Sequence, residues 1–307
     1  MHDLIIVGAG PAGITAAVYA ARRMMDVLVV SKNVGGQAAL TAEIENYTGY
    51  QFISGHDLAD RFREHIEKYG ISLKEEEALS VTKSGEVFTV NTPKGSYQSG
   101  AVILALGGRP KTLDVPGESE YQNRGVTYCP ICDGPLFVGK DVAVIGGGNS
   151  ALSAAVQLMP IARKIFLITV NSDLAGDNVL IEKVKGSGVV EIITRTETKE
   201  FTGGKFLSGV RVLTGGKEER LLSVEGAFIE IGWTPAVIPI KSDEGTLKLT
   251  AFGEVMVSDR FETSIPGLYA AGDVSSTPER QIIVAAGQGC IASLSAFKYL
   301  SKKSNKV

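Results

Sequence analysis

A short glycine-rich segment near the start of the chain constrains the fold more than any other feature. Gly8, Gly10 and Gly13 form the pattern G-x-G-x-x-G between the apolar run at residues 3–7 and the alanine-rich stretch at residues 14–23. In such a turn one glycine makes the bend, one lets the backbone approach a pyrophosphate, and one lets the helix pack on the strand. The helix N-terminus then faces the phosphates with its partial positive charge. The sequence therefore predicts a strand, a glycine turn and a helix that bind a dinucleotide.

The same arrangement recurs near the middle of the chain. A strand is predicted at residues 142–145, a glycine turn at 146–148, a helix at 149–159 and the next strand at 164–168. The turn has the form G-x-G-x-x-A, so a second pyrophosphate can lie on this helix. The residues that we assign to this possible nicotinamide nucleotide site are Gly146, Gly148, Asn149 and Ser150.

Two such units predict an α/β fold with two Rossmann-like, three-layer nucleotide-binding domains. Glycines and prolines between residues 107 and 117 mark a linker, and another cluster lies at residues 232–239. The end of the chain returns to a strand near residue 270 and a long helix. We therefore expect a discontinuous first domain at residues 1–112 and 246–307, with a second domain at 113–245 inserted into it.

Composition excludes several other classes of protein. The chain has 307 residues, of which 44% are apolar, and its 31 basic and 34 acidic residues are well mixed. We expect a folded protein that does not bind nucleic acid. The N-terminal sequence does not resemble a signal peptide, and no window reads as a membrane span, so we expect a cytoplasmic protein without membrane association.

A pair of cysteines in a C-x-x-C motif indicates redox chemistry. Cys129 and Cys132 lie between the linker and the second glycine turn, and Cys290 is the only other cysteine. Such a pair can cycle between dithiol and disulfide, because positive potential holds one thiol as the nucleophilic thiolate. A zinc site needs four ligands, and only Cys290 and three distant histidines remain. We therefore expect a redox pair and no metal.

Further segments resemble the FAD-binding signatures of low-molecular-weight thioredoxin reductases, which are class II pyridine nucleotide-disulfide oxidoreductases. They are Gly-Gly-Gln at 35–37, Glu-Asn-Tyr at 45–47 and Ala-Ala-Gly-Asp-Val at 270–274 with Arg-Gln at 280–281. Residues 125–137 look still more like the flavoprotein subunit of alkyl hydroperoxide reductase. The resemblance spans nearly the whole chain and implies FAD. The residues assigned to FAD are Gly8, Gly10, Pro11, Ala12, Gly13, Ser31, Gly36, Gln37, Asn46, Gly107, Gly272, Asp273, Arg280, Gln281 and Ile282.

The resemblance also implies roles for individual residues. Asp273 would touch a ribityl hydroxyl of the flavin, and the helix that Arg280 and Gln281 open would point its N-terminus at the isoalloxazine. Cys132 would accept electrons from the flavin, Cys129 would attack the disulfide of the partner, and Asp133 would move protons. The expected activity is therefore thioredoxin-disulfide reductase.

The expected partner is a thioredoxin or glutaredoxin-like protein. The hydroperoxide reductase flavoprotein has an extra N-terminal, thioredoxin-like relay, whereas this chain begins at its FAD strand, so we expect the relay to be a separate protein. By family likeness the protein is expected to be a homodimer. We also expect the two domains to rotate about linkers at residues 111–114 and 242–246, since the cysteines must reach both the flavin and a protein disulfide.

The sequence does not decide which molecule donates electrons to the flavin. In NADPH-dependent thioredoxin reductases a His-Arg-Arg and a further Arg bind the 2'-phosphate, but the corresponding residues here are Thr169, Val170, Asn171 and Ala175. NADH-using relatives have an acid at the position of Thr169, and Asp173 lies four residues farther on. Atypical relatives without these residues take electrons from reduced ferredoxin or a reduced deazaflavin. Standard NADPH is therefore not expected, and NADH, ferredoxin and deazaflavin remain candidates.

Two other functions compete with disulfide reduction. One is a flavin-dependent ferredoxin or nicotinamide reductase without disulfide chemistry, against which the C-x-x-C motif argues. The other is a redox-sensing flavoprotein with little turnover, which the missing nucleotide-binding cations favour.

Overall fold

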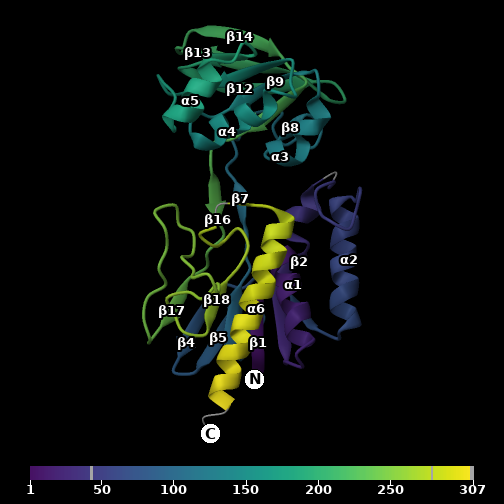
Figure 1. Cartoon of the computed structure of the whole chain (residues 1–307), viewed down its shortest axis with the longest axis vertical. Coiled ribbons are helices and arrows are strands. Elements are labelled where there is room, and N and C mark those ends of the chain that lie inside the picture. Colours follow the sequence, from purple (N-terminus) through teal and green to yellow (C-terminus); the bar gives the residue numbers. More distant parts are fainter. Residues whose placement is uncertain (42–43, 278, 305–307) are drawn as a thin grey trace. The chain divides into compact units, whose positions relative to one another are not determined.

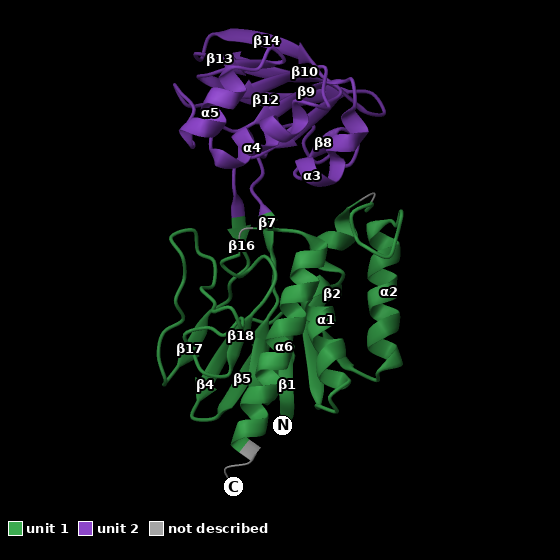
Figure 2. Cartoon of the chain, viewed as in Figure 1, with its two compact units in different colours: residues 1–109, 234–307 green, residues 110–233 purple. Residues whose placement is uncertain are grey.

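The computed structural model describes residues 1–41, 44–277 and 279–304. It divides into two compact units (Figure 2): the first comprises Met1–Arg109 with Thr234–Val307, and the second comprises Pro110–Trp233. The second unit is thus inserted into the first. The chain passes between the units in a two-stranded sheet of β7 (Gly108–Pro110) and β16 (Trp233–Pro235).

Both crossings lie earlier in the chain than the sequence predicted. Thr234 and the residues after it belong to the first unit because β17 (Ile240–Ser242) pairs with β4 (Ser80–Ser84) in its sheet. The predicted linker at 111–114 is also held inside a unit. The backbone N–H groups of Leu113 and Asp114 donate to the buried Glu118 carboxylate at 3.0 and 2.7 Å, which fixes them in the second unit.

A mixed sheet of eight strands forms the centre of the first unit (Figure 1). Its order is β17-β4-β5-β6-β1-β2-β3, with β18 beside β6, and the strands around β1 are parallel. The remaining bounds are β1 (His2–Ala9), β2 (Val27–Val34), β3 (Ser72–Glu75), β5 (Val87–Thr92), β6 (Gly95–Leu104) and β18 (Leu268–Ala270).

Helices cover one face of this sheet, which gives the unit its layers (Figure 1). They are α1 (Pro11–Ala21), α2 (Gly55–Lys68) and α6 (Ile282–Ser304), with a short 3-10 helix η1 (Gly36–Leu40). Leu4 and Ile6 of β1 pack toward the helices, whereas Ile5 and Val7 pack into the core of the opposite face. This alternation explains why β1 is apolar at every position from Leu4 to Val7: both of its faces are buried.

α6 is the single helix in the described part of the chain that is long and apolar enough to cross a membrane. The sequence predicts no such segment. Length and composition alone are weak grounds for a membrane span, since the core helix of a folded protein meets the same criteria. Ala285, Ala292 and Ala296 of α6 lie in the core of the first unit, where α6 packs along α1.

The second unit has a parallel sheet of five strands in the order β11-β10-β9-β15-β8. Their bounds are β8 (Val126–Thr127), β9 (Asp141–Ile145), β10 (Lys164–Ile168), β11 (Val190–Ile193) and β15 (Gly226–Ile229). The helices are α3 (Pro130–Asp133), α4 (Asn149–Leu158), α5 (Asn178–Lys185) and the 3-10 helix η2 (Gly134–Phe137). The strand order reverses between β9 and β15, and ligands of open α/β sheets bind beyond the carboxyl ends of the strands at such a point.

A separate antiparallel sheet of three strands completes the second unit. It consists of β12 (Thr196–Gly203), β13 (Leu207–Thr214) and β14 (Glu218–Ser223). Phe201, Val210 and Leu222 of this sheet pack against the parallel sheet in one core.

Candidate functional site

The glycine turn of the first unit leaves no room for side chains at two positions. A Cβ on Gly8 would lie 2.2 Å from the carbonyl oxygen of Ala105, and a Cβ on Gly13 would lie 1.9 Å from that of Gly8. Gly10, the N-cap of α1, has no atom closer than 3.9 Å to such a Cβ and cannot cap the helix with a side chain. The first turn of α1 therefore has no side-chain cap, and the space beside Gly10 lets a pyrophosphate approach the backbone there.

Ser31 of β2 stabilises this turn through two hydrogen bonds. Its Oγ accepts a hydrogen bond from the N–H of Ala9 at 3.1 Å and donates to the carbonyl oxygen of Asn33 at 2.7 Å. The proton of this hydroxyl is therefore used within the protein. Ser31, assigned to FAD from the sequence, has a visible role in holding the turn that would hold FAD.

The structure brings distant parts of the predicted FAD site together in the first unit. The Asn46 amide donates to Gln281 Oε1 at 3.3 Å, although the two residues are 235 positions apart in the chain. Gln37 is exposed, and Gly107 adopts a positive φ of 66° with no atom within 4 Å of an added Cβ. Gln37 follows β2 and Gly107 follows β6, the two neighbours of β1 in the sheet.

Asp273 follows Gly272 at the end of β18 in a largely buried position. Burial raises the pKa of the Asp273 carboxyl to about 6, and the positive charge of Arg280 partly opposes this shift. No side chain or backbone group in the described ranges donates a hydrogen bond to this carboxyl. A ligand hydroxyl would fit such an acceptor.

Gln288 of α6 supports the candidate site, although no sequence pattern indicates it. Its side chain is 6% exposed. Gln288 Oε1 accepts from the N–H of Gly272 at 2.7 Å, and its amide donates to Thr277 Oγ1 at 2.9 Å. Gln288 thus fixes the Gly272 turn against the last helix. Arg280, just before α6, forms an ion pair with Glu254 at 2.6 Å, and Ile282 begins the helix.

The two cysteines of the second unit form a disulfide at the start of α3. Cys129 and Cys132 are both half-buried, with Cα atoms 5.3 Å apart. The N–H of Cys132 donates to Cys129 Sγ at 3.2 Å, which favours negative charge on that sulfur. The Asp133 carboxylate accepts a hydrogen bond from the hydroxyl of Thr127, a residue that the sequence analysis did not single out. The pair and its neighbouring acid are therefore assembled within one unit.

The second glycine turn has the backbone form of a nucleotide-binding turn, but the side chains beside it differ from those of its nucleotide-binding relatives. Gly148 begins α4 without a side-chain cap, and Asn149 Oδ1 accepts from the N–H of Asp177 at 2.7 Å. Thr169 is 3% exposed, and its hydroxyl accepts from the N–H of Asn171 at 3.3 Å while packing on Gly147. Ser150 is exposed. Thr169 is therefore buried within its own turn and offers neither the cation nor the carboxylate that its relatives have at this position.

Glu230 is a second acid that sequence patterns did not reveal. It follows β15, whose Ile229 is in register with Ile145 of β9, so Glu230 lies beside Gly146 at the point where the strand order reverses. The Glu230 carbonyl oxygen is 2.3 Å from where a Cβ on Gly146 would lie. Burial raises the pKa of the Glu230 carboxyl to about 7.

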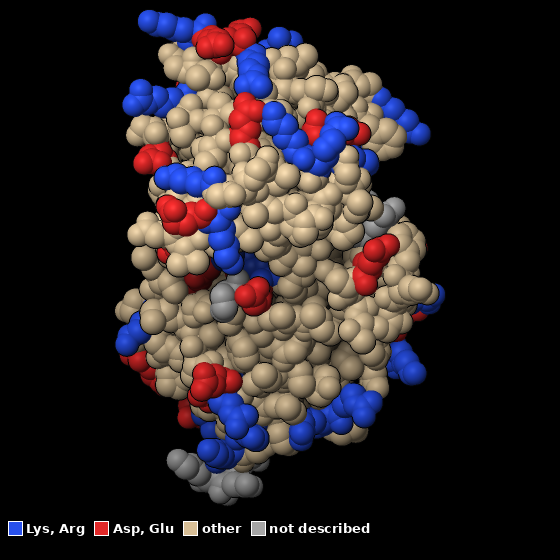
Figure 3. All heavy atoms as spheres, turned by 45° about the horizontal axis from the view of Figure 1, so that its top comes forward, with Lys and Arg blue, Asp and Glu red and all other residues tan. Residues whose placement is uncertain are grey.

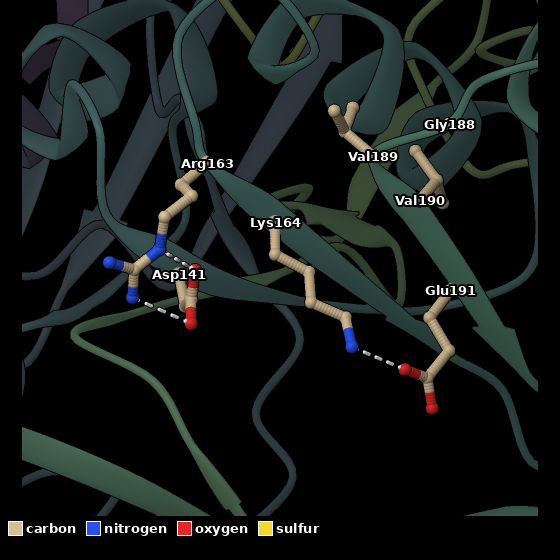
Figure 4. A pocket seen from close by; sticks show the side chains of 7 residues that line it. All are labelled: Asp141, Arg163, Lys164, Gly188, Val189, Val190 and Glu191. Carbon is tan, nitrogen blue, oxygen red and sulfur yellow. Dashed lines mark hydrogen bonds and ion pairs between the residues drawn. The ribbon is translucent and has the colours of Figure 1, made fainter.

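A pocket at the N-terminal ends of β9, β10 and β11, away from the glycine turn that follows β9, does not belong to the candidate site. Arg163 pairs with Asp141 at 2.8 Å and Lys164 with Glu191 at 2.7 Å (Figure 4), so the charges that line it neutralise one another. In Figure 3, acidic and basic side chains lie near one another at several places on the face drawn, between large areas of uncharged residues.

Comparisons with known proteins agree with this geometry. Residues 2–289 match the family described as pyridine nucleotide-disulphide oxidoreductase. The F subunit of alkyl hydroperoxide reductase from Pseudomonas putida is 42% identical over 308 residues, which cover 98% of this chain and 59% of that protein. A Bacillus subtilis (strain 168) protein named NADH dehydrogenase is 38% identical over 302 residues, which cover 97% of this chain and 58% of that protein.

A solved structure extends the likeness to the fold. Thioredoxin reductase from Streptococcus pyogenes MGAS5005 superimposes with a TM-score of 0.91 and 34% identity, covering 98% of this chain and 99% of that chain. The predicted α/β fold with two Rossmann-like domains is confirmed. The chain spans 59% of the length of the Pseudomonas putida relative.

Proposed function

Because this chain belongs to the pyridine nucleotide-disulphide oxidoreductase family, we propose that it is a thioredoxin-disulfide reductase that uses Cys132 and Cys129. The family uses FAD, and the predicted resemblance to thioredoxin reductases and to the hydroperoxide reductase flavoprotein is confirmed. The observation that carries the proposal is the half-exposed Cys129–Cys132 disulfide with Asp133 held beside it. Bound FAD would supply the two electrons that open this disulfide.

The first unit supplies the residues for FAD. The glycine turn and α1 would bind the pyrophosphate, and the Asp273 carboxyl would accept a hydrogen bond from a ribityl hydroxyl. The donor-free, buried state of this carboxyl in the described part of the chain supports that role.

The exchange reaction balances within the second unit. In the reduced pair, the Cys129 thiolate attacks one sulfur of the partner disulfide, and the second partner sulfur leaves and takes a proton from the Asp133 carboxyl. Asp133 then accepts the proton of the Cys132 thiol. The Cys132 thiolate attacks Cys129 Sγ, so that the mixed disulfide breaks and the Cys129–Cys132 disulfide re-forms. The released partner sulfur takes the proton from Asp133, and the partner leaves as a dithiol.

Cysteine variants test the proposal. Cys129→Ser should leave a flavin that can still be reduced but should abolish reduction of oxidised thioredoxin, because no nucleophile remains for the partner. Cys132→Ser should stop electron transfer from the flavin to the pair. Cys290→Ser is the matched control and should keep full activity, since Cys290 lies on α6 of the first unit. Full thioredoxin reduction by either variant of the pair would contradict the assignment.

Electrons reach this protein, in our proposal, from a donor other than standard NADPH. No Lys or Arg occurs between Lys164 and Lys183, whereas Asp173 and Asp177 lie in this stretch. A 2'-phosphate needs charge-assisted donors, and acids oppose its binding. NADH is the nicotinamide candidate, since a relative is named NADH dehydrogenase. Reduced ferredoxin or a reduced deazaflavin are the others.

Flavin bleaching identifies the donor. The holoprotein is mixed anaerobically with NADPH, NADH or reduced ferredoxin at equal concentration, and loss of the oxidised flavin spectrum is followed. We expect NADPH to be the slower of the two nicotinamides. Rapid bleaching by NADPH, unaffected by high salt, would contradict this part of the proposal.

A redox-sensing flavoprotein with little turnover is the second candidate. The missing cations beside the second glycine turn favour it, because a sensor needs no efficient donor site. A sensor would not pass electrons from its photoreduced flavin to thioredoxin within seconds, whereas a reductase would.

A further inference from the structure

The hydroxyl of Thr127 links the redox pair to the neighbouring acid. Thr127 Oγ1 accepts a hydrogen bond from the N–H of Cys129 at 3.2 Å and donates one to Asp133 Oδ2. A hydroxyl can do both at once, because it has one proton and two lone pairs. A single atom thus touches the backbone of the first cysteine and the carboxylate that follows the second.

The sheet fixes this hydroxyl in place. Thr127 is 7% exposed and ends β8, where it is in register with the fully buried Phe228 of β15. Its β-branched side chain has few rotamers. In contrast, α3 is a single turn and all of its residues are at least partly exposed. The rigid partner in the Thr127–Asp133 hydrogen bond is therefore the threonine.

We propose that Thr127 is a positioning residue for thiol–disulfide exchange, which holds the Asp133 carboxyl where it can exchange protons with the cysteine pair. The inference rests on the proposed function. Without the Thr127 hydroxyl, the Asp133 carboxyl would lose the hydrogen bond that aims it at the cysteine pair, so the leaving partner sulfur would depart as an unprotonated and poorer leaving group.

Three substitutions, two at Thr127 and one elsewhere in the second unit, separate this role from a structural one. Thr127→Val keeps the shape and removes the hydroxyl, whereas Thr127→Ser keeps the hydroxyl. Thr198→Val is the matched control: Thr198 is also 7% exposed in the second unit, and its hydroxyl has no hydrogen-bond partner among the described residues. All three are compared with Asp133→Asn and with the double variant of Thr127→Val and Asp133→Asn.

The first measurement is the rate at which the reduced holoprotein reduces thioredoxin, followed across pH. Thr127→Val should slow it about tenfold or more and move the alkaline side of the pH–rate profile to higher pH, since the lost hydrogen bond favoured the charged carboxylate over the protonated form that acts as the acid. Thr127→Ser should restore both rate and profile, and Thr198→Val should change neither. The double variant should be no slower than Asp133→Asn alone. Equal slowing in the Asp133→Asn background, or failure of Thr127→Ser to rescue, would overturn the proposal.

A second measurement does not depend on a protein partner. The pair is reduced with dithiothreitol in the holoprotein, and alkylation of its thiols by iodoacetamide is followed across pH. Thr127→Val should shift this profile, Thr127→Ser should not, and the shift should vanish in the Asp133→Asn background. If this pattern is found but wild-type protein does not reduce thioredoxin, the proposed function fails while the role of Thr127 stands. An unshifted profile in Thr127→Val would overturn that role.

Discussion

The protonation of Asp273 offers the most direct test of where FAD binds. Burial raises the pKa of this carboxyl to about 6, and only the charge of Arg280 opposes the shift. A ribityl hydroxyl that donates to the carboxylate would stabilise its charged form and lower its pKa. Binding of FAD would then release a proton from Asp273.

The sign of the resulting pH dependence follows from this linkage. Affinity for FAD should increase as pH rises through about 6, the value that Asp273 has without the hydroxyl donor. Asp273→Asn should bind FAD more weakly and flatten this dependence, because the amide does not titrate. Fluorescence of released flavin measures both effects, and the exposed Asp259→Asn is the control. An unchanged pH dependence in Asp273→Asn would show that this carboxyl does not contact the flavin.

Single residues differ in how far the sequence reveals them. Gly8, Gly10 and Gly13 could be predicted because their spacing alone encodes the turn. Thr127 and Gln288 could not, since each acts through hydrogen bonds to segments whose position depends on the whole fold. No local pattern distinguishes such a buried polar side chain from an ordinary core neighbour.

Elements with uniform burial were the easiest to predict. β1, β9 and β10 are continuous apolar runs between glycines or charges, because both faces of a parallel sheet are covered. The antiparallel sheet of β12, β13 and β14 was not predicted, since its strands carry many polar residues on their exposed face. The second chain crossing was placed too late because β17 pairs with β4, about 160 residues away, and such long-range pairing has no local signature.

Glu230, directly after β15, leads to a prediction about how the stability of the second unit depends on pH. Burial raises the pKa of Glu230 to about 7, so the folded second unit holds this proton more tightly than the unfolded chain does. Stability should therefore fall as pH rises from the ordinary glutamate pKa toward about 7 and level off above it, by up to about 3 kcal/mol.

Glu230→Gln should remove this fall in stability with pH. Relative to wild type, the variant should therefore be more stable above a pH of about 7 than it is at low pH. Denaturant unfolding followed by the fluorescence of Trp233, the sole tryptophan, measures the effect in the second unit. Glu219→Gln, an exposed substitution in β14 of the same unit, should show the wild-type pH dependence. Parallel curves for wild type and Glu230→Gln would contradict a buried, titrating Glu230.

The whole molecule divides its chemistry between two units. The candidate FAD residues lie in the first unit, and the cysteine pair with Thr127 and Asp133 lies in the second. The α/β architecture and the insertion could be predicted, because each glycine turn marks one nucleotide-binding unit. The donor could not, since the second turn keeps its backbone while the residues at the positions of the 2'-phosphate cations, Thr169, Val170, Asn171 and Ala175, are uncharged.

Transfer of flavin electrons to a protein disulfide is the central claim, and one anaerobic mixing experiment tests it. The holoprotein is photoreduced, mixed with oxidised thioredoxin, and assayed for reoxidised flavin and for new thioredoxin thiols. Our account predicts that flavin is reoxidised and thioredoxin thiols appear within seconds, with two thiols from the electrons of each flavin and two more from each reduced Cys129–Cys132 pair, and none with Cys129→Ser. A flavin that stays reduced in the presence of oxidised thioredoxin, with no thiols formed, would contradict it.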